Sequence, residues 1–177
     1  GERIVKIGDL RAEEAGVTIN AGGLAVCPGF IDIHSHSDRS LVAQNKGLSS
    51  LQQGITTQVT GNCGHSLAPT RDASGDLEDV ASGHGLTELK PEWRTFAQYL
   101  DWQTRRGVGI NMAPLVGHGA VRRYVMGPEG QGGERAVPTV AELEGMRAAV
   151  AEAMAAGAFG LSVGLEDPPG RNAAAAA

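Results

Sequence analysis

A short apolar stretch, residues 30–33, follows a Pro-Gly pair and runs directly into a His-Ser-His sequence. Its β-branched side chains and the Pro-Gly pair before it are typical of a buried strand. Side chains alternate between the two faces of a strand, so Asp32, His34 and His36 are expected to share one face. Two imidazoles there can bind one metal ion, and Asp32 is expected to hold a ring N–H of one of them. The stretch therefore predicts a metal site built on a β-sheet.

Similar apolar segments recur along the chain and alternate with helix-like segments. Strands are expected near residues 30–33, 55–60, 108–112 and 159–163. Repeated strand–helix units predict an α/β fold with a parallel sheet, either doubly wound or closed as a (β/α)8 barrel. No G-x-G-x-x-G sequence follows the first strand, which weakens the doubly wound, dinucleotide-binding version. Polar residues gather just after the strands, where the active sites of barrels lie, so residues 28–172 are expected to form the first half of a barrel.

Two helices are predicted by a capping box, in which Thr is followed three positions later by Glu or Gln, and by a glycine at the end. They cover residues 96–106 and 140–156, with the boxes Thr95/Gln98 and Thr139/Glu142. Their inner faces are expected to consist of Phe96, Tyr99 and Leu100 in the first, and of Leu143, Met146, Val150 and Met154 in the second.

The rest of the chain departs from this rhythm. Residues 1–27 alternate short apolar runs with Gly and Asn, which predicts strand–turn–strand structure with too few strands to be stable alone. Residues 71–92 are polar and Gly-rich without a clear period, and are expected to form a rim over the sheet. Residues 173–177 are alanines that neither cap a helix nor begin a strand. We therefore expect a partial β domain, then the α/β part, then an alanine tail.

Charge and cysteine content restrict the expected partners and location. The formal net charge is −5 and no basic patch is present, so neither nucleic acid nor a membrane surface is an expected partner. No segment is long and apolar enough to span a bilayer, and the first residues lack the order of a signal peptide. Cysteines at positions 27 and 63 do not make a disulfide scaffold and fit a reducing compartment. A cytoplasmic protein is expected.

A further candidate ligand follows the second predicted strand. Cys63 lies in a Gly-Asn-Cys-Gly sequence directly after residues 55–60, so it is expected at the same edge of the sheet as His34 and His36. The flanking glycines allow the backbone to approach a bound group closely, and a metal would keep the thiolate ionised. Cys27 is instead expected to be a small, buried apolar residue. The sequence thus adds Cys63 to the metal site.

Other polar residues are weaker candidates. His118 lies between two glycines after the third strand, and is expected either to contact substrate or a metal ligand, or to shape the loop. The rest are expected mainly in structural or solvated roles: His65 pointing away from the site, Asp38 capping the segment after it, Arg122 and Arg123 in solvent, and Ser162 as a minor pocket candidate.

The resemblance to a known family rests on four blocks of sequence. They are P-G-F-I-D-I-H-S-H-S-D, Q-G-I-T-T-Q-V-T-G-N-C-G-H-S, L-V-G-H-G-A-V-R-R-Y-V-M-G and G-A-F-G-L-S-V-G-L. Over about residues 3–172 the chain resembles the D-aminoacylase (N-acyl-D-amino-acid deacylase) branch of the amidohydrolase superfamily. H-x-H marks only the superfamily, whereas G-N-C-G is much more specific. The resemblance implies a metal-dependent (β/α)8 barrel beside a small β-sandwich, to which residues 1–27 would belong.

The resemblance also implies a reaction and a ligand set. Cys63 matches a cysteine that takes part in a tight zinc site, and His34 and His36 match ligands that serve chiefly a second, weaker metal position. The implied reaction is zinc-dependent hydrolysis of a small N-acyl-D-amino acid to a D-amino acid and a carboxylate. The family's later histidines and its general-base aspartate have no counterpart here, so the segment alone is expected to be inactive.

Two alternatives stay open. A cyclic-amide hydrolase of dihydroorotase or hydantoinase type shares the H-x-H sequence but favours a carboxylated lysine on the fourth strand. The lysines of this chain are Lys6, Lys46 and Lys90, none of them near residues 159–163. A non-catalytic, metal-binding relative of the barrel enzymes would keep the ligands and lack the base.

Overall fold

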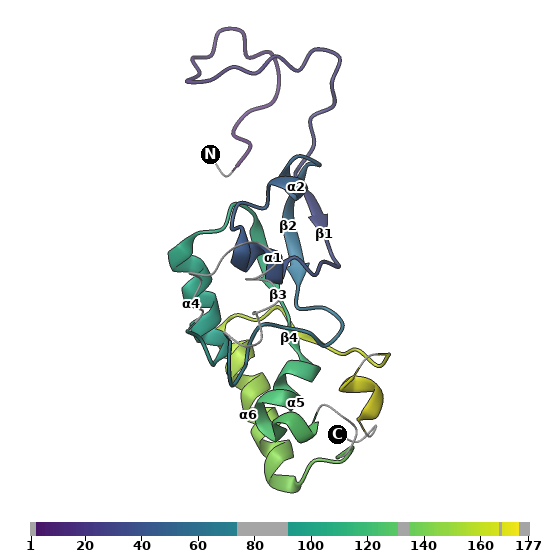
Figure 1. The fold of residues 1–177 in the computed structure, drawn as a ribbon. Helices are drawn as coiled ribbons and strands as arrows, with labels where there is room; N and C mark the ends of the chain where they lie inside the picture. Colours follow the sequence, from purple (N-terminus) through teal and green to yellow (C-terminus); the bar gives the residue numbers. More distant parts are fainter. Residues whose placement is uncertain (1–2, 74–91, 131–134, 167, 174–177) are drawn as a thin grey trace.

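The computed structural model describes residues 3–73, 92–130, 135–166 and 168–173. The amino-terminal residues extend away from the body of the molecule, and the rest forms strands flanked by helices (Figure 1). The rim predicted over residues 71–92 and the alanine tail lie mostly outside the described residues. Both remain predictions.

Parallel strands form the centre of the fold. They are β1 (Phe30–Asp32), β2 (Ile55–Thr60), β3 (Asn111–Pro114), β4 (Val116–Gly117) and β5 (Leu161–Ser162). The first three form a parallel sheet in the order β1-β2-β3, and β4 pairs in parallel with β5. Backbone bonds join the two sheets: Leu115 donates to the carbonyl of Thr60, and Phe159 donates to the carbonyl of Pro114, both at 2.9 Å. Neighbouring strands therefore follow chain order, and the predicted parallel α/β class is confirmed.

Helices cover the connections between strands. They are α1 (Asp38–Ala43), α2 (Leu48–Leu51), α4 (Phe96–Arg106), α5 (His118–Met126) and α6 (Val140–Ala156), with 3-10 turns η2 (Pro128–Gly130) and η3 (Gly170–Asn172). The bounds of α4 and α6 are those predicted, and both capping boxes form. None of the helices in the described ranges is long and apolar enough to cross a bilayer.

The core lies where α4, α5 and α6 pack together. The indole of Trp93, just before α4, is 2% exposed, and its Nε1 donates to the carbonyl of Leu67 at 2.7 Å. Phe96 and Tyr99 are buried and Leu100 packs against them, as predicted for this face of α4. On α6, Met146 is buried as predicted, with Leu143 and Val150 partly buried. The prediction for Met154 is wrong, because this side chain is 46% exposed.

The bounds of two strands, β3 and β5, differ from the predictions. β3 begins at Asn111, whereas the apolar pattern predicted residues 108–112. The backbone before it packs against the connection between α1 and α2: Gly109 donates to the carbonyl of Asn45 at 2.8 Å, and Ile110 is buried. β5 is limited to the residues that pair with β4, and so is shorter than the predicted residues 159–163.

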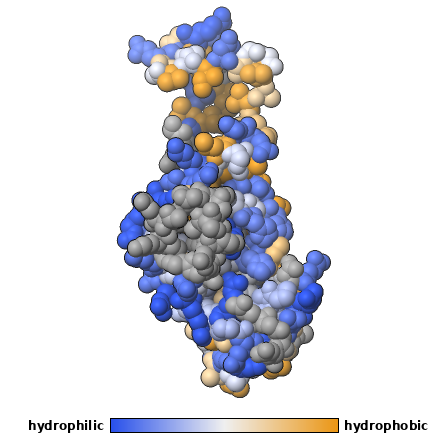
Figure 2. Space-filling view, viewed as in Figure 1, coloured by the Kyte–Doolittle hydropathy of each residue, from blue (hydrophilic) through white to orange (hydrophobic). Residues whose placement is uncertain are grey.

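The amino-terminal strands predicted within residues 1–27 do not form among the described residues 3–27. Their apolar side chains are exposed, with Val5 at 95% and Val26 at 86%, and they gather at one end of the molecule (Figure 2). A strand needs a partner for its backbone groups, and short strand pairs are marginal in water. The same exposure corrects the prediction for Cys27, which is exposed rather than buried.

Candidate metal centre

The parallel pairing of β1 with β2 brings two distant segments to one edge of the sheet. β1 ends at Asp32 and β2 ends at Thr60, and their chains leave the sheet in the same direction. His34 and His36 therefore lie in the loop after β1, so the strand alternation that was predicted to place them on one face with Asp32 does not extend to them. Their rings nevertheless lie close together, with centroids 5.5 Å apart.

The three predicted ligands converge. One donor atom from each of His34, His36 and Cys63 lies within 4.8 Å of the others. Sγ of Cys63 is 3.3 Å from Nε2 of His34. Both histidines are exposed and Cys63 is half-buried, so the cluster is open on one side. Two imidazole nitrogens and one thiolate are ligand types that zinc prefers.

The backbone around Cys63 has an unusual conformation. Cys63 has φ of +55°, and it lies in the turn that contains Gly61 (φ +75°) and Gly64 (φ +76°). A Cβ on Gly61 would lie 2.2 Å from the carbonyl oxygen of Leu115, and one on Gly64 would lie 3.0 Å from the backbone nitrogen of Gly164. We predicted that these glycines let the backbone approach a bound group. The close approach is instead to neighbouring backbone segments, which pack against the turn.

Asp32 has a different contact from the one predicted. Its Oδ1 accepts a hydrogen bond from the backbone N–H of His34 at 3.1 Å, not from an imidazole ring. His34 lies beyond the end of β1, where the chain turns into a loop. The donor that the Asp32 carboxylate meets there is the backbone N–H of His34 and not its ring. Asp32 therefore holds the loop that carries the histidine pair.

The loop of the histidine pair is also held from β2. Gln58 is 3% exposed, and its carbonyl accepts a hydrogen bond from the hydroxyl of Ser37 at 2.8 Å. The amide of Gln58 donates to the hydroxyl of Ser35 at 3.3 Å, and the backbone of Ser35 donates to the carbonyl of Val59 at 3.0 Å. Sequence reasoning missed these residues, because nothing local marks a glutamine inside a strand as a partner of a loop.

His118 is the first residue of α5, and its surroundings are those of a buried polar group. Both ring nitrogens are shielded from solvent, and neither has a hydrogen-bond partner in the described part of the chain. Burial, and then the nearby charge of Arg122, lower the pKa of His118 below its ordinary value. The buried ring nitrogens of His118 therefore have unused hydrogen-bonding capacity among the described residues. It is not one of the three residues whose donor atoms converge.

The weaker candidates take mixed positions. Asp38 is buried as the first residue of α1, and this burial raises its pKa. The N-cap position belongs to Ser37 and has no side-chain cap hydrogen bond, so the prediction that Asp38 caps the helix is wrong. Contrary to prediction, Arg122 is 1% exposed, and its guanidinium donates to the carbonyls of Gly130, Arg135 and Ala136. Ser162 is buried and contacts the turn of Cys63.

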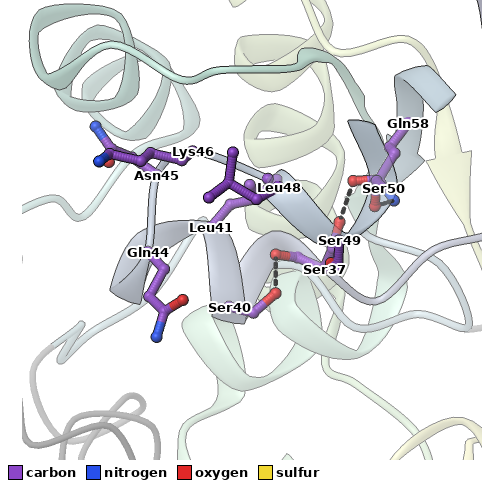
Figure 3. Close-up of a pocket in the computed structure, with 11 residues that line it drawn as sticks. Ser37, Ser40, Leu41, Gln44, Asn45, Lys46, Leu48, Ser49, Ser50 and Gln58 are labelled. Carbon is purple, nitrogen blue, oxygen red and sulfur yellow. Dashed lines mark hydrogen bonds between the residues drawn. The ribbon is translucent and has the colours of Figure 1, made fainter. Parts of the chain in front are cut away.

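Two cavities lie near these elements. A cavity of about 170 Å³ is lined by His36, Asp38, His65 and Arg123 among others. That the His65 side chain points away from the site stays a prediction. A cavity of about 490 Å³ lies between α1, α2 and β2, with Leu41, Lys46 and four serines in its lining (Figure 3). The three ligands do not line this larger cavity, and its neutral hydroxyls offer no reactive constellation. Within the described residues, the candidate chemistry is therefore concentrated at His34, His36 and Cys63.

Known proteins resemble this chain along nearly its whole length. The model of the amidohydrolase family matches residues 17–175. An N-acyl-D-aspartate deacylase from Alcaligenes xylosoxydans xylosoxydans is 41% identical over 96% of this chain, and a D-aminoacylase from the same organism is 40% identical over 98%. The chain spans 32% and 34% of these two relatives, or about a third of their length.

Solved structures agree with this. A crystal structure of D-aminoacylase matches with a TM-score of 0.82 and 36% identity, covering 98% of this chain and 35% of that one. An N-acyl-D-glutamate deacylase from Bordetella bronchiseptica, solved with zinc and a phosphonate inhibitor, matches with a TM-score of 0.68 and 38% identity, covering 84% of this chain and 30% of that one. The predicted resemblance to the D-aminoacylase branch is confirmed, and the chain belongs to the amidohydrolase family.

Proposed function

We propose that the complete protein is a zinc-dependent hydrolase that cleaves the amide bond of N-acyl-D-amino acids to give a D-amino acid and a carboxylate. One observation carries the proposal: donor atoms of His34, His36 and Cys63 lie within 4.8 Å of one another at the carboxyl ends of adjacent parallel strands. Support for the substrate class comes from the relatives, an N-acyl-D-aspartate deacylase and a D-aminoacylase at 41% and 40% identity.

The donor set fits one tight zinc ion and a second, weaker metal position. Cys63 would contribute a thiolate, which brings a full negative charge, whereas each imidazole is a neutral ligand. When bound, zinc supplies Lewis acidity, which lowers the pKa of a coordinated water and polarises the acyl carbonyl. A solved D-aminoacylase with a binuclear metal centre supports two positions.

The residues of this chain would hold the ligands and leave room for the substrate. Asp32 would fix the backbone of His34, the first residue of the histidine pair. We assign His118 to contact the substrate or a group that orients a metal ligand, because its buried ring nitrogens have no partner within the described residues. The aspartate that accepts the proton in the family has no counterpart in these residues, so the segment alone would not hydrolyse substrate.

The same proposal extends to architecture. Residues 28–172 would form the amino-terminal half of a (β/α)8 barrel, and residues 1–27 would contribute strands to a small β-sandwich. The chain order of the parallel strands supports the first assignment. The exposed apolar side chains of residues 4, 5, 7, 17, 19, 24 and 26 support the second, because a sandwich would bury them.

Cellular context follows from charge and cysteines. The net charge of −5 favours a small-molecule substrate over nucleic acid or an anionic membrane. Two free cysteines, at positions 27 and 63, support a reducing compartment, and we propose the cytoplasm.

The test uses the full-length protein. We expect release of the D-amino acid from N-acetyl-D-glutamate, N-acetyl-D-aspartate or N-acetyl-D-leucine, no release from the L-enantiomers, loss of activity after chelation and recovery on adding zinc. His118→Ala should weaken substrate binding and so raise KM, without emptying the metal site. Ring opening of dihydroorotate or a hydantoin without cleavage of the linear amides would favour the cyclic-amide alternative. Zinc binding without any hydrolysis would favour a non-catalytic relative.

A further inference from the structure

The turn that carries Cys63 has a backbone conformation that must be held by its surroundings. At φ +55°, Cys63 is in the left-handed region, which is unfavourable for a residue with a Cβ. Such residues persist where neighbouring groups fix them, and they cluster at functional sites. Two buried polar side chains contact this turn, and neither has been assigned a part in the metal centre.

The first is Asn62, the residue directly before Cys63. Its side chain is buried, and Nδ2 donates to the carbonyl of Ser35 at 3.0 Å and to that of Val59 at 2.9 Å. Ser35 stands between His34 and His36 in the chain. One amide group therefore joins the loop of the histidine pair to the turn of the cysteine, and both of its hydrogens are used.

The second is Ser162, which comes from β5 and lies 98 positions after Gly64. Its hydroxyl accepts a hydrogen bond from the backbone N–H of Gly64 at 3.0 Å and donates to the carbonyl of Gly61. These backbone groups lie on either side of Cys63. A hydroxyl is both a donor and an acceptor, so the single side chain of Ser162 can bond to the backbone before and after Cys63.

We propose that Asn62 and Ser162 are positioning residues of the metal centre, which hold Cys63 in its left-handed conformation with Sγ 3.3 Å from Nε2 of His34. The proposal rests on the proposed function, because it assumes that Cys63 is a metal ligand. Without the two side chains, the bond from Asn62 to Ser35 and the bonds of Ser162 to the backbone of Gly61 and Gly64 are lost. Cys63 is then free to relax to a right-handed conformation. That change would turn the thiol away from the two imidazoles.

The chain contains matched controls for both residues. Asn45 also donates through Nδ2 to two backbone carbonyls, those of Arg106 and Gly107, away from the three ligands. The buried hydroxyl of Ser66 also makes two backbone hydrogen bonds: it accepts from the N–H of Gly117 and donates to the carbonyl of Ala68. Asn45→Ala and Ser66→Ala therefore remove the same kinds of bond, none of which is made to residues 61–64.

The experiment uses the full-length protein and has two readouts besides activity. Zinc affinity is measured by competition with a chelating dye, and the cobalt-substituted protein is examined for the sulfur-to-cobalt charge-transfer absorption. We expect Asn62→Ala and Ser162→Ala to lower zinc affinity about 10–100-fold and to weaken the absorption band. Asn45→Ala and Ser66→Ala should keep both. Ser162→Thr retains the hydroxyl and should bind zinc as the unchanged protein does.

The outcomes separate the two proposals. Zinc affinity of Asn62→Ala and Ser162→Ala equal to that of their controls, while Cys63→Ala loses zinc, would overturn the positioning role and leave the metal centre standing. If Cys63→Ala also binds zinc fully, the metal centre itself is wrong, and the proposed function fails with it. Should Asn62→Ala not fold, Asn62→Ser decides: it keeps at most one donor, and undiminished zinc affinity in it would overturn the role of Asn62.

Discussion

Sγ of Cys63 lies 3.3 Å from Nε2 of His34, although 29 positions separate them in the chain. The pairing of β1 with β2 places the ends of the two strands side by side, and the left-handed turn after β2 directs the thiol back toward the loop after β1. The contact joins the two segments that the sequence marked independently.

Replacing Cys63 should empty the metal centre more completely than replacing either histidine. A thiolate contributes a negative charge and a soft donor, whereas an imidazole contributes a neutral nitrogen. In the full-length protein we expect Cys63→Ala to lose zinc and hydrolysis, and His36→Asn to retain substantial zinc. Metal analysis of the purified variants checks this. Full zinc and a near-normal rate in Cys63→Ala would reduce the cysteine to a packing residue.

Reconstitution of the metal-free protein with zinc tests whether a carboxylated lysine is among the ligands. With no lysine near β5, no carboxylated lysine is expected among the ligands, so the apoprotein should recover equally with zinc in the presence and absence of bicarbonate. A requirement for bicarbonate would point to a lysine ligand and to the cyclic-amide branch.

Substitutions of Asp32 should separate its hydrogen bond from its charge. The side chain accepts from the backbone N–H of His34, and an asparagine can accept in the same way through its carbonyl oxygen. We therefore expect Asp32→Asn to bind zinc nearly as well as the unchanged protein, and Asp32→Ala to bind it less tightly, by up to about 10-fold. The zinc affinity of the two variants checks this. Equal losses in both would show that the carboxylate charge, not the bond to His34, is what matters.

Gly61→Ala should destabilise the fold more than the same substitution at a glycine that also has a positive φ but has free space around its Cα. A Cβ on Gly61 would lie 2.2 Å from the carbonyl oxygen of Leu115, in addition to its φ of +75°. Gly157, at φ +113°, is the matched control, because its nearest atom would be Cδ1 of Leu100 at 3.8 Å. We expect Gly157→Ala to cost about 1–2 kcal/mol and Gly61→Ala about 1–3 kcal/mol more. Chemical denaturation checks the difference, and equal losses would contradict the close packing of this turn.

The cap of α6 should make stability depend on acid pH. Hydrogen bonds from the backbone of Thr139 and from Arg135 lower the pKa of Glu142 from 4.5 to about 2. A lowered pKa in the folded state means that the stabilisation is complete above pH 4.5 and is lost as the pH falls toward 2. The difference in unfolding temperature between the unchanged protein and Glu142→Gln should therefore shrink over this range.

Glu144 provides the comparison for this experiment. It lies on the same helix and pairs with Arg147 at the surface, but takes no part in the cap. Glu144→Gln removes an equal charge, so the excess pH dependence of Glu142→Gln over Glu144→Gln isolates the cap. A difference that stays constant from pH 4.5 to 2 would contradict the role of the Glu142 charge.

Features whose causes are local could be predicted from the sequence. The capping boxes of α4 and α6 act between residues three positions apart, so the bounds of both helices followed from the sequence alone. β2 was predicted in full, and the candidate ligands His34, His36 and Cys63 were marked by strand ends and by residue type. Residue type and local order are enough for such features, because the physical cause lies within the segment itself.

Features whose causes are distant were decided by the tertiary structure. The start of β3 depends on packing against the connection between α1 and α2, and the exposure of residues 3–27 depends on partner strands that no local pattern supplies. The burial of Arg122 depends on the carbonyls of Gly130, Arg135 and Ala136, to which its guanidinium donates. Ser162 meets the turn of Cys63 only because β5 is brought beside it, 98 positions from Gly64. The sequence thus determined which residues are the candidate metal ligands, whereas only the folded chain determined which side chains contact the segments that carry them.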